Sequence, residues 1–267
     1  MYTVYGITSS PGNLGGGRVT MENDFLRPIA NKAPKYREVA YKVIKDAILA
    51  GQIGPQQPLV EEQLAGLLNI SRTPVREALA ILEHEGLIAP RGIRGLYVRR
   101  LRRQEFIELF VANELIEPSL ARRAAHLASE DQIRLLEENI NRGQYFVGEG
   151  DFTSFLRSGR EFHRLLGIAA ENKPLTDFIV RNEECTDIYL IGTGKITSKE
   201  TMQVSIREHT AILNAIIRRD PDEAARLVIV HAQSIRERFA DQFSEGNSEE
   251  DEEPYRDLKG LEGVVNP

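Results

Sequence analysis

The sequence is poor in cysteine, with one thiol, Cys185, among 267 residues. A single cysteine cannot form an internal disulfide, and it leaves no second sulfur for a cysteine-based metal site. This usage fits a reducing compartment, where disulfides are rare. We therefore expect Cys185 to be a packing residue.

Long apolar runs are absent as well. None approaches the ~20 consecutive apolar residues of a membrane helix, and residues 1–18 lack the basic and then apolar order of a secretory signal. The run Gly15-Gly16-Gly17 is not followed by the Lys-Ser/Thr of a phosphate-binding loop, and no His-Glu-x-x-His motif occurs. These absences favour a cytoplasmic protein without a nucleotide-binding loop or a metalloprotease motif.

Positive charge is scarce overall, since the formal net charge is −6, but it is concentrated in one segment. Residues 35–103 contain 12 Lys or Arg against 7 Asp or Glu, a net charge of +5 that leaves −11 for the remainder. Nucleic acid responds to the local field of a protein and not to its average charge. Residues 35–103 are therefore the candidate DNA-binding segment.

The basic segment has the apolar spacing of three helices followed by a hairpin. Helical periodicity predicts helices over Tyr36–Ala50 and Glu61–Leu68, and a third that begins after Ser71 as its N-cap. Two short β-prone runs, Leu87–Ala89 and Leu96–Val98, stand on either side of a turn rich in arginine and glycine. This order predicts a winged helix-turn-helix domain.

The chain beyond residue 103 predicts long helices without strand alternation. Six amphipathic segments are expected, over Phe106–Leu127, Glu130–Val147, Phe152–Ala170, Pro174–Ile191, Ser198–Arg219 and Pro221–Phe243. No repeat with a period of ~20–50 residues relates them, so we expect one helical bundle and not a solenoid. The predicted fold class is mainly α, with an N-terminal winged helix-turn-helix and an all-α bundle.

These patterns divide the chain into four parts. We expect residues 1–32 to be a disordered arm with few periodic apolar positions, and residues 244–267 to be an acidic disordered tail. Between them, residues 33–101 form the predicted DNA-binding domain, and residues 104–243 form the predicted helical domain.

The third predicted helix carries two arginines that suit the major groove of DNA. Arg72 and Arg76 lie four residues apart and so share one helix face, with Thr73 between them, while Val75 and Leu79 face the core. An arginine fork can engage both acceptors on the edge of a guanine. Alone, an Arg-x-x-x-Arg pair is more often a solvated helix face.

The predicted hairpin strengthens the DNA-binding interpretation. Arg91 and Arg94 are placed to reach phosphate or the minor groove, and Gly92 and Gly95 allow the backbone to approach the sugar-phosphate chain closely. A basic helix, a basic hairpin and a local charge of +5 coincide in one segment, which makes the joint signal more specific than any of its parts.

The stretches Leu59–Ala65, Ser71–Leu79 and Gly86–Ile88 resemble the GntR family. The following segment resembles the FCD domain, the all-helical effector domain of the FadR-type branch, so the resemblance covers roughly residues 33–243. It implies a regulator of transcription that binds a palindromic DNA operator as a homodimer and responds to a small metabolite. The residues and the resemblance together give the candidate DNA contacts Ser71, Arg72, Thr73, Arg76, Arg91, Arg94 and Gly95.

Three histidines, His163, His209 and His231, lie on three separate predicted helices of the bundle. Three imidazoles from packed helices can converge on one ion, although from the residues alone scattered histidines are more often packing or surface residues. The motifs around them resemble those of metal-containing FCD domains. The resemblance implies one divalent metal ion of the zinc or nickel type, bound by these histidines.

Two positions depart from the family pattern. Gly159 stands where the metal-containing subgroup usually has an aspartate four residues before the first histidine, so one ligand is missing, and water, an effector oxygen or Glu161 are the alternatives. Asn113 stands four residues before Glu117, where the family often has an arginine that resembles a carboxylate clamp. Our hypothesis is that Asn113 binds an effector that is less anionic than usual or that carries an amine.

Two other classes of function are weighed against the regulator. A metal-dependent hydrolase would use the three histidines with Glu208 as a base, but it leaves Arg72 and Arg76 unexplained. A helical interaction module would pair its helix-turn-helix with protein instead of DNA. We expect a DNA-binding regulator and not an enzyme.

Overall fold

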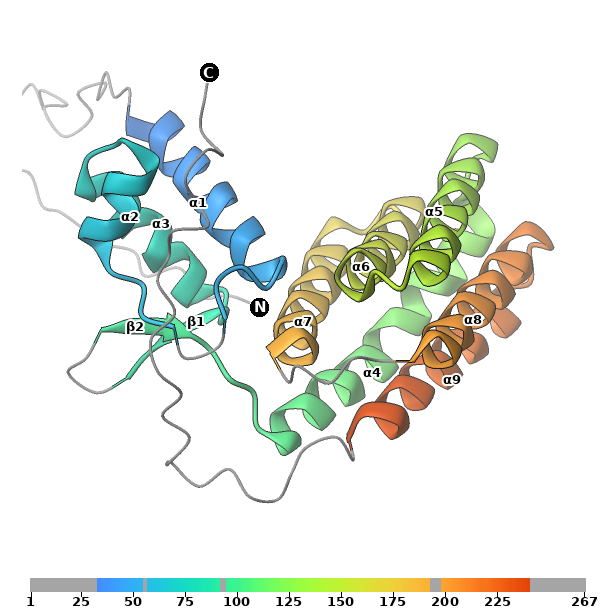
Figure 1. Cartoon of the computed structure of the whole chain (residues 1–267). Coiled ribbons are helices and arrows are strands. Elements are labelled where there is room, and N and C mark those ends of the chain that lie inside the picture. The colour runs from blue at the N-terminus through green and yellow to red at the C-terminus, as the bar shows by residue number, and fades with distance from the viewer. Residues whose placement is uncertain (1–32, 55–56, 92–94, 193–197, 241–267) are drawn as a thin grey trace, which may run out of the picture. The chain divides into compact units, whose positions relative to one another are not determined.

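The computed structural model describes residues 33–54, 57–91, 95–192 and 198–240 (Figure 1). The predicted arm at 1–32 and acidic tail at 244–267 lie outside these residues, as do Gly92 and Arg94 of the predicted wing tip. Within the described ranges, no helix has the length and apolarity that a membrane crossing requires.

The N-terminal elements follow the order of a winged helix-turn-helix. Helices α1 (Ala33–Leu49), α2 (Glu61–Leu68) and α3 (Arg72–His84) precede strands β1 (Ile88–Pro90) and β2 (Leu96–Val98). The two strands are antiparallel, with Ile88 opposite Val98 and Pro90 opposite Leu96. Strand β1 begins one residue later than predicted because the Leu87 N–H still bonds to the Leu82 carbonyl at 3.0 Å.

The turn between α2 and α3 depends on Asn69. This residue has a left-handed backbone with φ 50, and its N–H reaches the Gly66 carbonyl at 3.2 Å. Asparagine tolerates this conformation better than most residues, which lets the chain reverse within two residues. Ser71 then precedes α3 with an extended backbone, as predicted for an N-cap, although its side chain makes no capping hydrogen bond.

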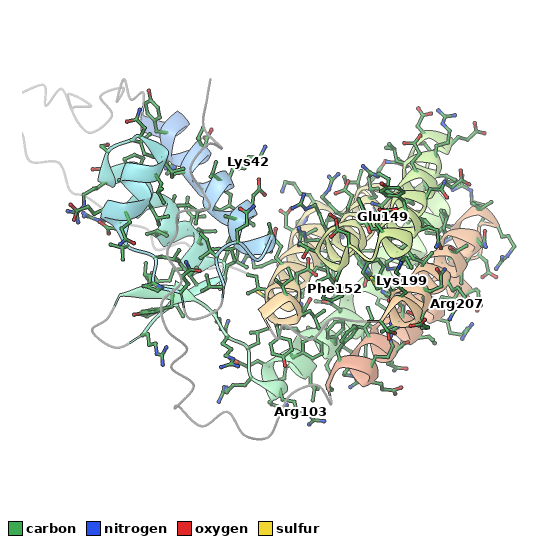
Figure 2. The ribbon with its side chains drawn as sticks, in the orientation of Figure 1. Lys42, Arg103, Glu149, Phe152, Lys199 and Arg207 are labelled. Carbon is green, nitrogen blue, oxygen red and sulfur yellow. The ribbon has the colours of Figure 1, made fainter. Side chains whose placement is uncertain are left out.

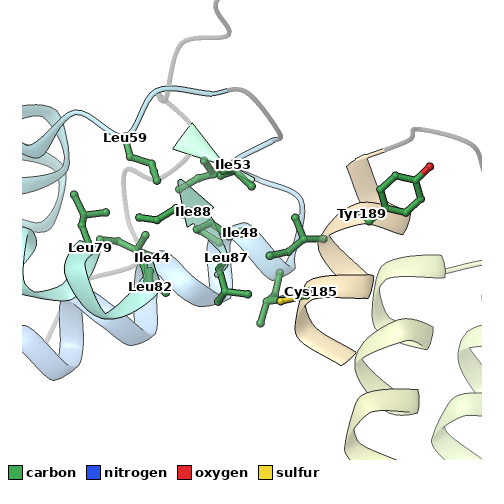
Figure 3. Packing of buried hydrophobic residues seen from close by; sticks show 14 of the residues in the cluster. Ile44, Ile48, Ile53, Leu59, Leu79, Leu82, Leu87, Ile88, Cys185 and Tyr189 are labelled. Atoms are coloured by element: carbon green, nitrogen blue, oxygen red, sulfur yellow. The ribbon is translucent and has the colours of Figure 1, made fainter. Parts of the chain in front are cut away.

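An apolar core holds the winged helix together (Figure 3). Ile44 and Ile48 of α1 meet Leu79 and Leu82 of α3, all with at most 1% of their surface exposed. Burial of each such side chain contributes about 1.5–3 kcal/mol. The α3 face that enters this core is therefore fixed, and its opposite face is left to the solvent.

The remainder of the described chain is helical. The six helices are α4 (Arg103–Leu127), α5 (Glu130–Glu149), α6 (Phe152–Ala169), α7 (Lys173–Gly192), α8 (Lys199–Ile217) and α9 (Pro221–Ala240). Helix α4 packs against α6, α7, α8 and α9 and is thus the central helix of the bundle. The predicted fold class is confirmed.

Local capping sets several helix boundaries. Helix α4 begins three residues earlier than predicted because Glu105 accepts a hydrogen bond from the Arg102 N–H at 2.9 Å. Ser129 and Asp151 are the N-caps of α5 and α6, and their side chains accept hydrogen bonds from the N–H groups of Gln132 and Ser154. The Lys199 ammonium at the start of α8 contacts the Gly148 carbonyl at the end of α5, and this contact joins the two helix ends. Figure 2 labels Lys199 and Glu149, the residue that follows Gly148.

A second apolar core fills the bundle. It includes Leu120, Leu136, Phe162 and Ile212, none of which is measurably exposed. Cys185 is a free, buried thiol, as expected of a packing residue.

Helices α6 and α7 approach closely at Gly167. A Cβ atom at this position would lie 2.5 Å from Cγ2 of Thr176, whose hydroxyl donates to the Asn172 carbonyl at 2.7 Å. We expect Gly167→Ala to lower the free energy of unfolding by about 1–3 kcal/mol, because the helices must separate to admit the methyl group. Urea denaturation monitored by circular dichroism measures this loss.

The matched control is Gly148→Ala in α5, where nothing lies within 4 Å of the added Cβ. This change removes a glycine from a helix and should stabilise the protein by about 0.5–1 kcal/mol. Equal stability of the two alanine variants would contradict the close approach of α6 and α7.

Candidate functional site

The N-terminal half of α3 presents its predicted polar face to solvent. Ser71, Arg72, Thr73 and Arg76 are exposed, whereas Val75 is fully buried. The side-chain exposures of Arg72 and Arg76 are 58% and 64%. The two long donors on this helix therefore lie on an accessible face.

Both arginines are held by one carboxylate that the sequence analysis did not identify. The Arg76 guanidinium donates through Nε and Nη2 to the two oxygens of Glu61, each at 2.9 Å, and Arg72 Nη2 lies 3.4 Å from the same residue. The hydrogen bond from Arg76 lowers the pKa of Glu61. Exposed ion pairs of this kind stabilise a fold little, so the main effect is to orient the guanidinium groups.

The wing lies beside this face. Gly95 has φ 101, a conformation that favours glycine, and its carbonyl accepts from the Arg91 N–H at 3.0 Å. The Arg91 guanidinium lies over the Tyr97 ring, 5.8 Å from its centroid. A groove of about 500 Å³ is lined by Arg72, Arg76 and Gly95 together, so the helix and the wing share one surface.

The three histidines predicted on separate helices do converge. His163 of α6, His209 of α8 and His231 of α9 are buried, and one ring nitrogen from each lies within 4.8 Å of the others. The Nε2 atoms of His209 and His231 are 3.1 Å apart. This set of nitrogen donors fits a zinc- or nickel-type ion.

The protonation of His209 and His231 also suits a metal. Burial lowers the pKa of both imidazoles well below 6.5, and the neighbouring His163 lowers them further. A metal ligand must be a neutral imidazole, which these two rings are at neutral pH. Burial also lowers the pKa of His163, but the carboxylates of Glu117 and Glu183 outweigh it and raise that pKa to about 9.

Two carboxylates contact Nδ1 of the His163 and His231 rings. Glu117 of α4 contacts Nδ1 of His163, and Oε2 of Glu208 lies 2.8 Å from Nδ1 of His231. Glu208 is also 3.2 Å from the Arg238 guanidinium. Carboxylates that accept from Nδ1–H are the usual outer partners of metal-binding histidines.

The missing aspartate position lies beside this cluster. A Cβ atom at Gly159 would be 3.9 Å from Cε1 of His209, an ordinary contact distance. Glu161, one of the alternatives for the missing ligand, instead accepts from Arg164 at 2.6 and 2.7 Å. The structure therefore does not bring Glu161 to the histidines.

Asn113, the second departure from the family pattern, lies in a buried polar chain. Its Nδ2 donates to Glu183 at 2.8 Å, and its Oδ1 accepts from Asn182 at 2.9 Å. Arg160 of α6 contacts Asp187 one turn further along α7. The sequence pattern did not identify the α7 residues, because their partners lie about 70 residues away on α4.

Burial in this polar chain disfavours the charged form of Glu183. Burial raises its pKa to about 7, opposed by the charge of His163. The other charged groups that act on it are Glu117, Asp187 and Arg160. The pKa of Glu183 in the folded protein exceeds the ordinary value of 4.5. Between pH 4.5 and about pH 7, folding therefore takes up a proton at Glu183, and the free energy of unfolding falls as the pH rises through this range.

We expect Glu183→Gln to remove this pH dependence. At pH 8 the variant should unfold with a free energy about 1–3 kcal/mol higher than the wild type, and the difference should shrink towards pH 5. Urea titrations at both pH values measure it. Glu161→Gln, which alters a carboxylate paired with Arg164, is the control and should change neither value by more than about 0.5 kcal/mol. A gain that is the same at both pH values would count against the burial of a charged Glu183.

Comparison with known proteins covers both halves of the chain. The model for bacterial regulatory proteins of the gntR family matches residues 36–98, and the FCD domain model matches residues 108–234. The HTH-type transcriptional repressor NanR of Klebsiella aerogenes is 31% identical over 232 residues, which cover 78% of this chain and 86% of that protein. The HTH-type transcriptional repressor RspR of Escherichia coli K12 is 28% identical over 208 residues, 78% of this chain and 90% of that protein.

Two solved structures share the fold. Escherichia coli McbR/YncC superposes with a TM-score of 0.71 at 17% identity and covers 78% of this chain and 99% of its own. A GntR transcriptional regulator from Rhodococcus sp. RHA1 gives 0.69 at 18% identity, with coverages of 79% and 100%. The matched families are transcription regulators, which leaves the hydrolase alternative without support.

Proposed function

The chain belongs to the GntR family of transcription regulators and carries an FCD domain, and we propose that it reads its DNA operator with the N-terminal face of α3. The observation that carries this proposal is the exposure of Arg72 and Arg76 on the groove that also includes Gly95 of the wing. In this proposal residues 33–101 bind DNA, and residues 104–243 bind the effector and form the dimer.

The chemistry of the groove supports direct reading of bases. When α3 enters the major groove, Arg72 and Arg76 can exchange the oxygens of Glu61 for the two acceptors of a guanine edge. Ser71 and Thr73, at the N-terminus of the helix, are placed for phosphate contacts. Arg91 and Arg94 would then contact phosphate or the minor groove, with Gly95 allowing the close approach.

We propose that the regulator acts as a homodimer on a palindromic operator, as one winged helix alone reads a short site. An uncovered apolar strip on α4 supports self-association. Val111 and Leu115 lie one turn apart with 39% and 77% of their surfaces exposed. Large aliphatic side chains that are exposed on the same face of a helix are typical of a surface that packs against a partner.

The helical domain is the proposed effector site, and His163, His209 and His231 are the proposed ligands of one divalent metal ion. Such an ion, when bound, would supply a Lewis acid that attracts an oxygen or nitrogen donor of the effector. Asn113 contributes an amide where an arginine would hold a carboxylate, and Glu183 lies next to it. This pairing supports an effector that is less anionic than a simple organic acid or that carries an amine.

We further propose that the protein is cytoplasmic and has no catalytic activity, since its operator would be cellular DNA and its matched families are regulators.

The DNA-reading proposal predicts the effect of removing both arginines. The double variant Arg72→Ala and Arg76→Ala should bind a duplex selected in vitro with the wild-type protein more weakly, by about 1–3 kcal/mol for each base that these side chains read. Fluorescence anisotropy at several salt concentrations measures both the affinity and the slope of its logarithm against salt. If either arginine also touches a phosphate, its removal reduces this slope by about 1.

The control is Arg134→Ala in α5, an exposed arginine that pairs with Asp131 and lies far along the chain from the winged helix. It should leave the affinity and the salt dependence unchanged. Retention of full affinity by the double variant, or an equal loss in the control, would refute the assignment of α3 as the reading helix.

A further inference from the structure

Helix α7 contacts the winged helix as well as the rest of the bundle. Both domains belong to one compact unit, and in it α1 packs against α7. Figure 3 shows Cys185 of α7 close to Ile48 and Leu87 of the winged helix, with which it shares one apolar cluster. Further along α7, Cγ2 of Ile191 is 2.6 Å from the position that a Cβ atom would take at Gly51. The C-terminal half of α7 is therefore in direct contact with the DNA-binding domain.

A largely buried ion cluster joins the two domains at this place. The Lys45 ammonium of α1 lies 2.8 Å from Oε2 of Glu184 on α7 and 2.9 Å from Oε2 of Glu85 at the end of α3. The side chains of Lys45 and Glu184 are only 14% and 11% exposed. Beside them, Sγ of Cys185 lies 4.0 Å from the Glu85 carbonyl oxygen. We call these four residues, Lys45, Glu85, Glu184 and Cys185, the α7 contact.

The α7 contact can open without leaving the lysine unpaired. Glu85 belongs to the winged helix, as does Tyr41, whose hydroxyl donates to Glu85 at 2.7 Å and accepts from Lys45 at 2.7 Å. Separation of the domains breaks the pair of Lys45 with Glu184 and leaves the pair of Lys45 with Glu85 intact. A buried ion that loses its last partner is strongly unfavourable, and this arrangement spares Lys45 that penalty.

The α7 contact also leaves the reading face of α3 uncovered. Glu85 follows the C-terminal end of α3, whereas Arg72 and Arg76 lie in its N-terminal half and are exposed. Glu85 and Arg72 are about 20 Å apart along the helix axis. The winged helix can thus meet DNA while α7 holds its other end, and the contact with α7 fixes its direction relative to the bundle.

We propose that the α7 contact holds each winged helix in a fixed orientation on the bundle, so that a dimer presents both to two half-sites at once. Lys45 and Glu184 are positioning residues that act through this orientation and touch no DNA. Without the contact, each winged helix is a tethered domain that must be ordered when it binds, which lowers affinity only where two half-sites are read together. This inference rests on the proposed reading of a palindromic operator by a homodimer.

The test compares Lys45→Met with the control Lys42→Met, both in the full chain. Lys45→Met keeps an aliphatic stem but removes the ammonium between Glu85 and Glu184. Lys42→Met removes the same charge from the exposed side of α1 (Figure 2). Cys185 is the only cysteine of the chain and is buried in the contact, so its rate of reaction with a chromogenic aromatic disulfide reports opening. Circular dichroism checks that each variant is folded.

Cys185 should react about 10–100-fold faster in Lys45→Met than in the wild type, the factor that corresponds to the loss of one hydrogen bond between charged groups. Lys42→Met should react at the wild-type rate. DNA binding is measured by fluorescence anisotropy on a duplex selected in vitro with the wild type and on a shortened duplex with one half-site. Lys45→Met should lose about tenfold of the wild-type preference for two half-sites and should bind one half-site as Lys42→Met does.

Equal thiol rates in folded Lys45→Met and the wild type would overturn the role of Lys45 in the contact. A faster thiol reaction with an unchanged preference for two half-sites would overturn the positioning role. If Lys45→Met does not fold, Glu184→Gln weakens the contact from the bundle side, where Lys45 keeps Glu85, and the same outcomes apply. Failure of the wild type to bind either duplex would reject the proposed reading of DNA, whereas the thiol rates would still decide whether Lys45 holds the contact.

Discussion

Buried polar side chains need hydrogen-bonding partners, and at the centre of this bundle the partners lie on other helices. Asn113 and Glu117 of α4 are each only 1% exposed, and their partners lie on α7 and α6 respectively. Glu208 connects α8 to α9 through His231. A shift of α4, α6, α7, α8 or α9 by a turn would leave a buried charge or amide without its partner, so these contacts fix the register that apolar packing alone leaves open.

The same requirement explains why single substitutions at the centre change the chemistry of the site. An asparagine at position 113 gives Glu183 a neutral neighbour, and the pKa of Glu183 is raised to about 7 as burial outweighs the nearby positive charge. A glycine at position 159 removes a potential ligand without disturbing the packing of α6, since helical geometry tolerates it there. Two small changes of side chain thus alter the electrostatics of the interior while the fold is retained.

The sequence predicts those features that depend on local pattern. Apolar periodicity and turn residues place all the described helices and strands within a few residues of their observed ends, and the position of α2 is correct at both ends. The residues alone did not predict that the three histidines converge, whereas the resemblance to a metal-containing family favoured it. Capping contacts such as that of Glu105 explain the small errors, because they depend on loop geometry that periodicity does not report.

Contacts between distant residues could not be predicted in this way. Glu61 and Arg76 are 15 residues apart and on different helices, and Glu117 and His163 are separated by 46. No spacing rule for one helix relates such positions, and their pairing follows only once the helices are packed. The roles of Glu183 and Asn182 were missed for the same reason.

The pairing of Glu61 with the two arginines has a consequence for how the surface meets DNA. A carboxylate presents two acceptors side by side, as a guanine edge does, so Arg76 is already spread into a forked geometry before any duplex arrives. Much of the rotamer freedom that the Arg76 side chain would lose on binding is therefore already lost when the protein folds. In the proposed reading of DNA by α3, Glu61 is thus an internal substitute for the base, and an operator has to compete with Glu61 for Arg76.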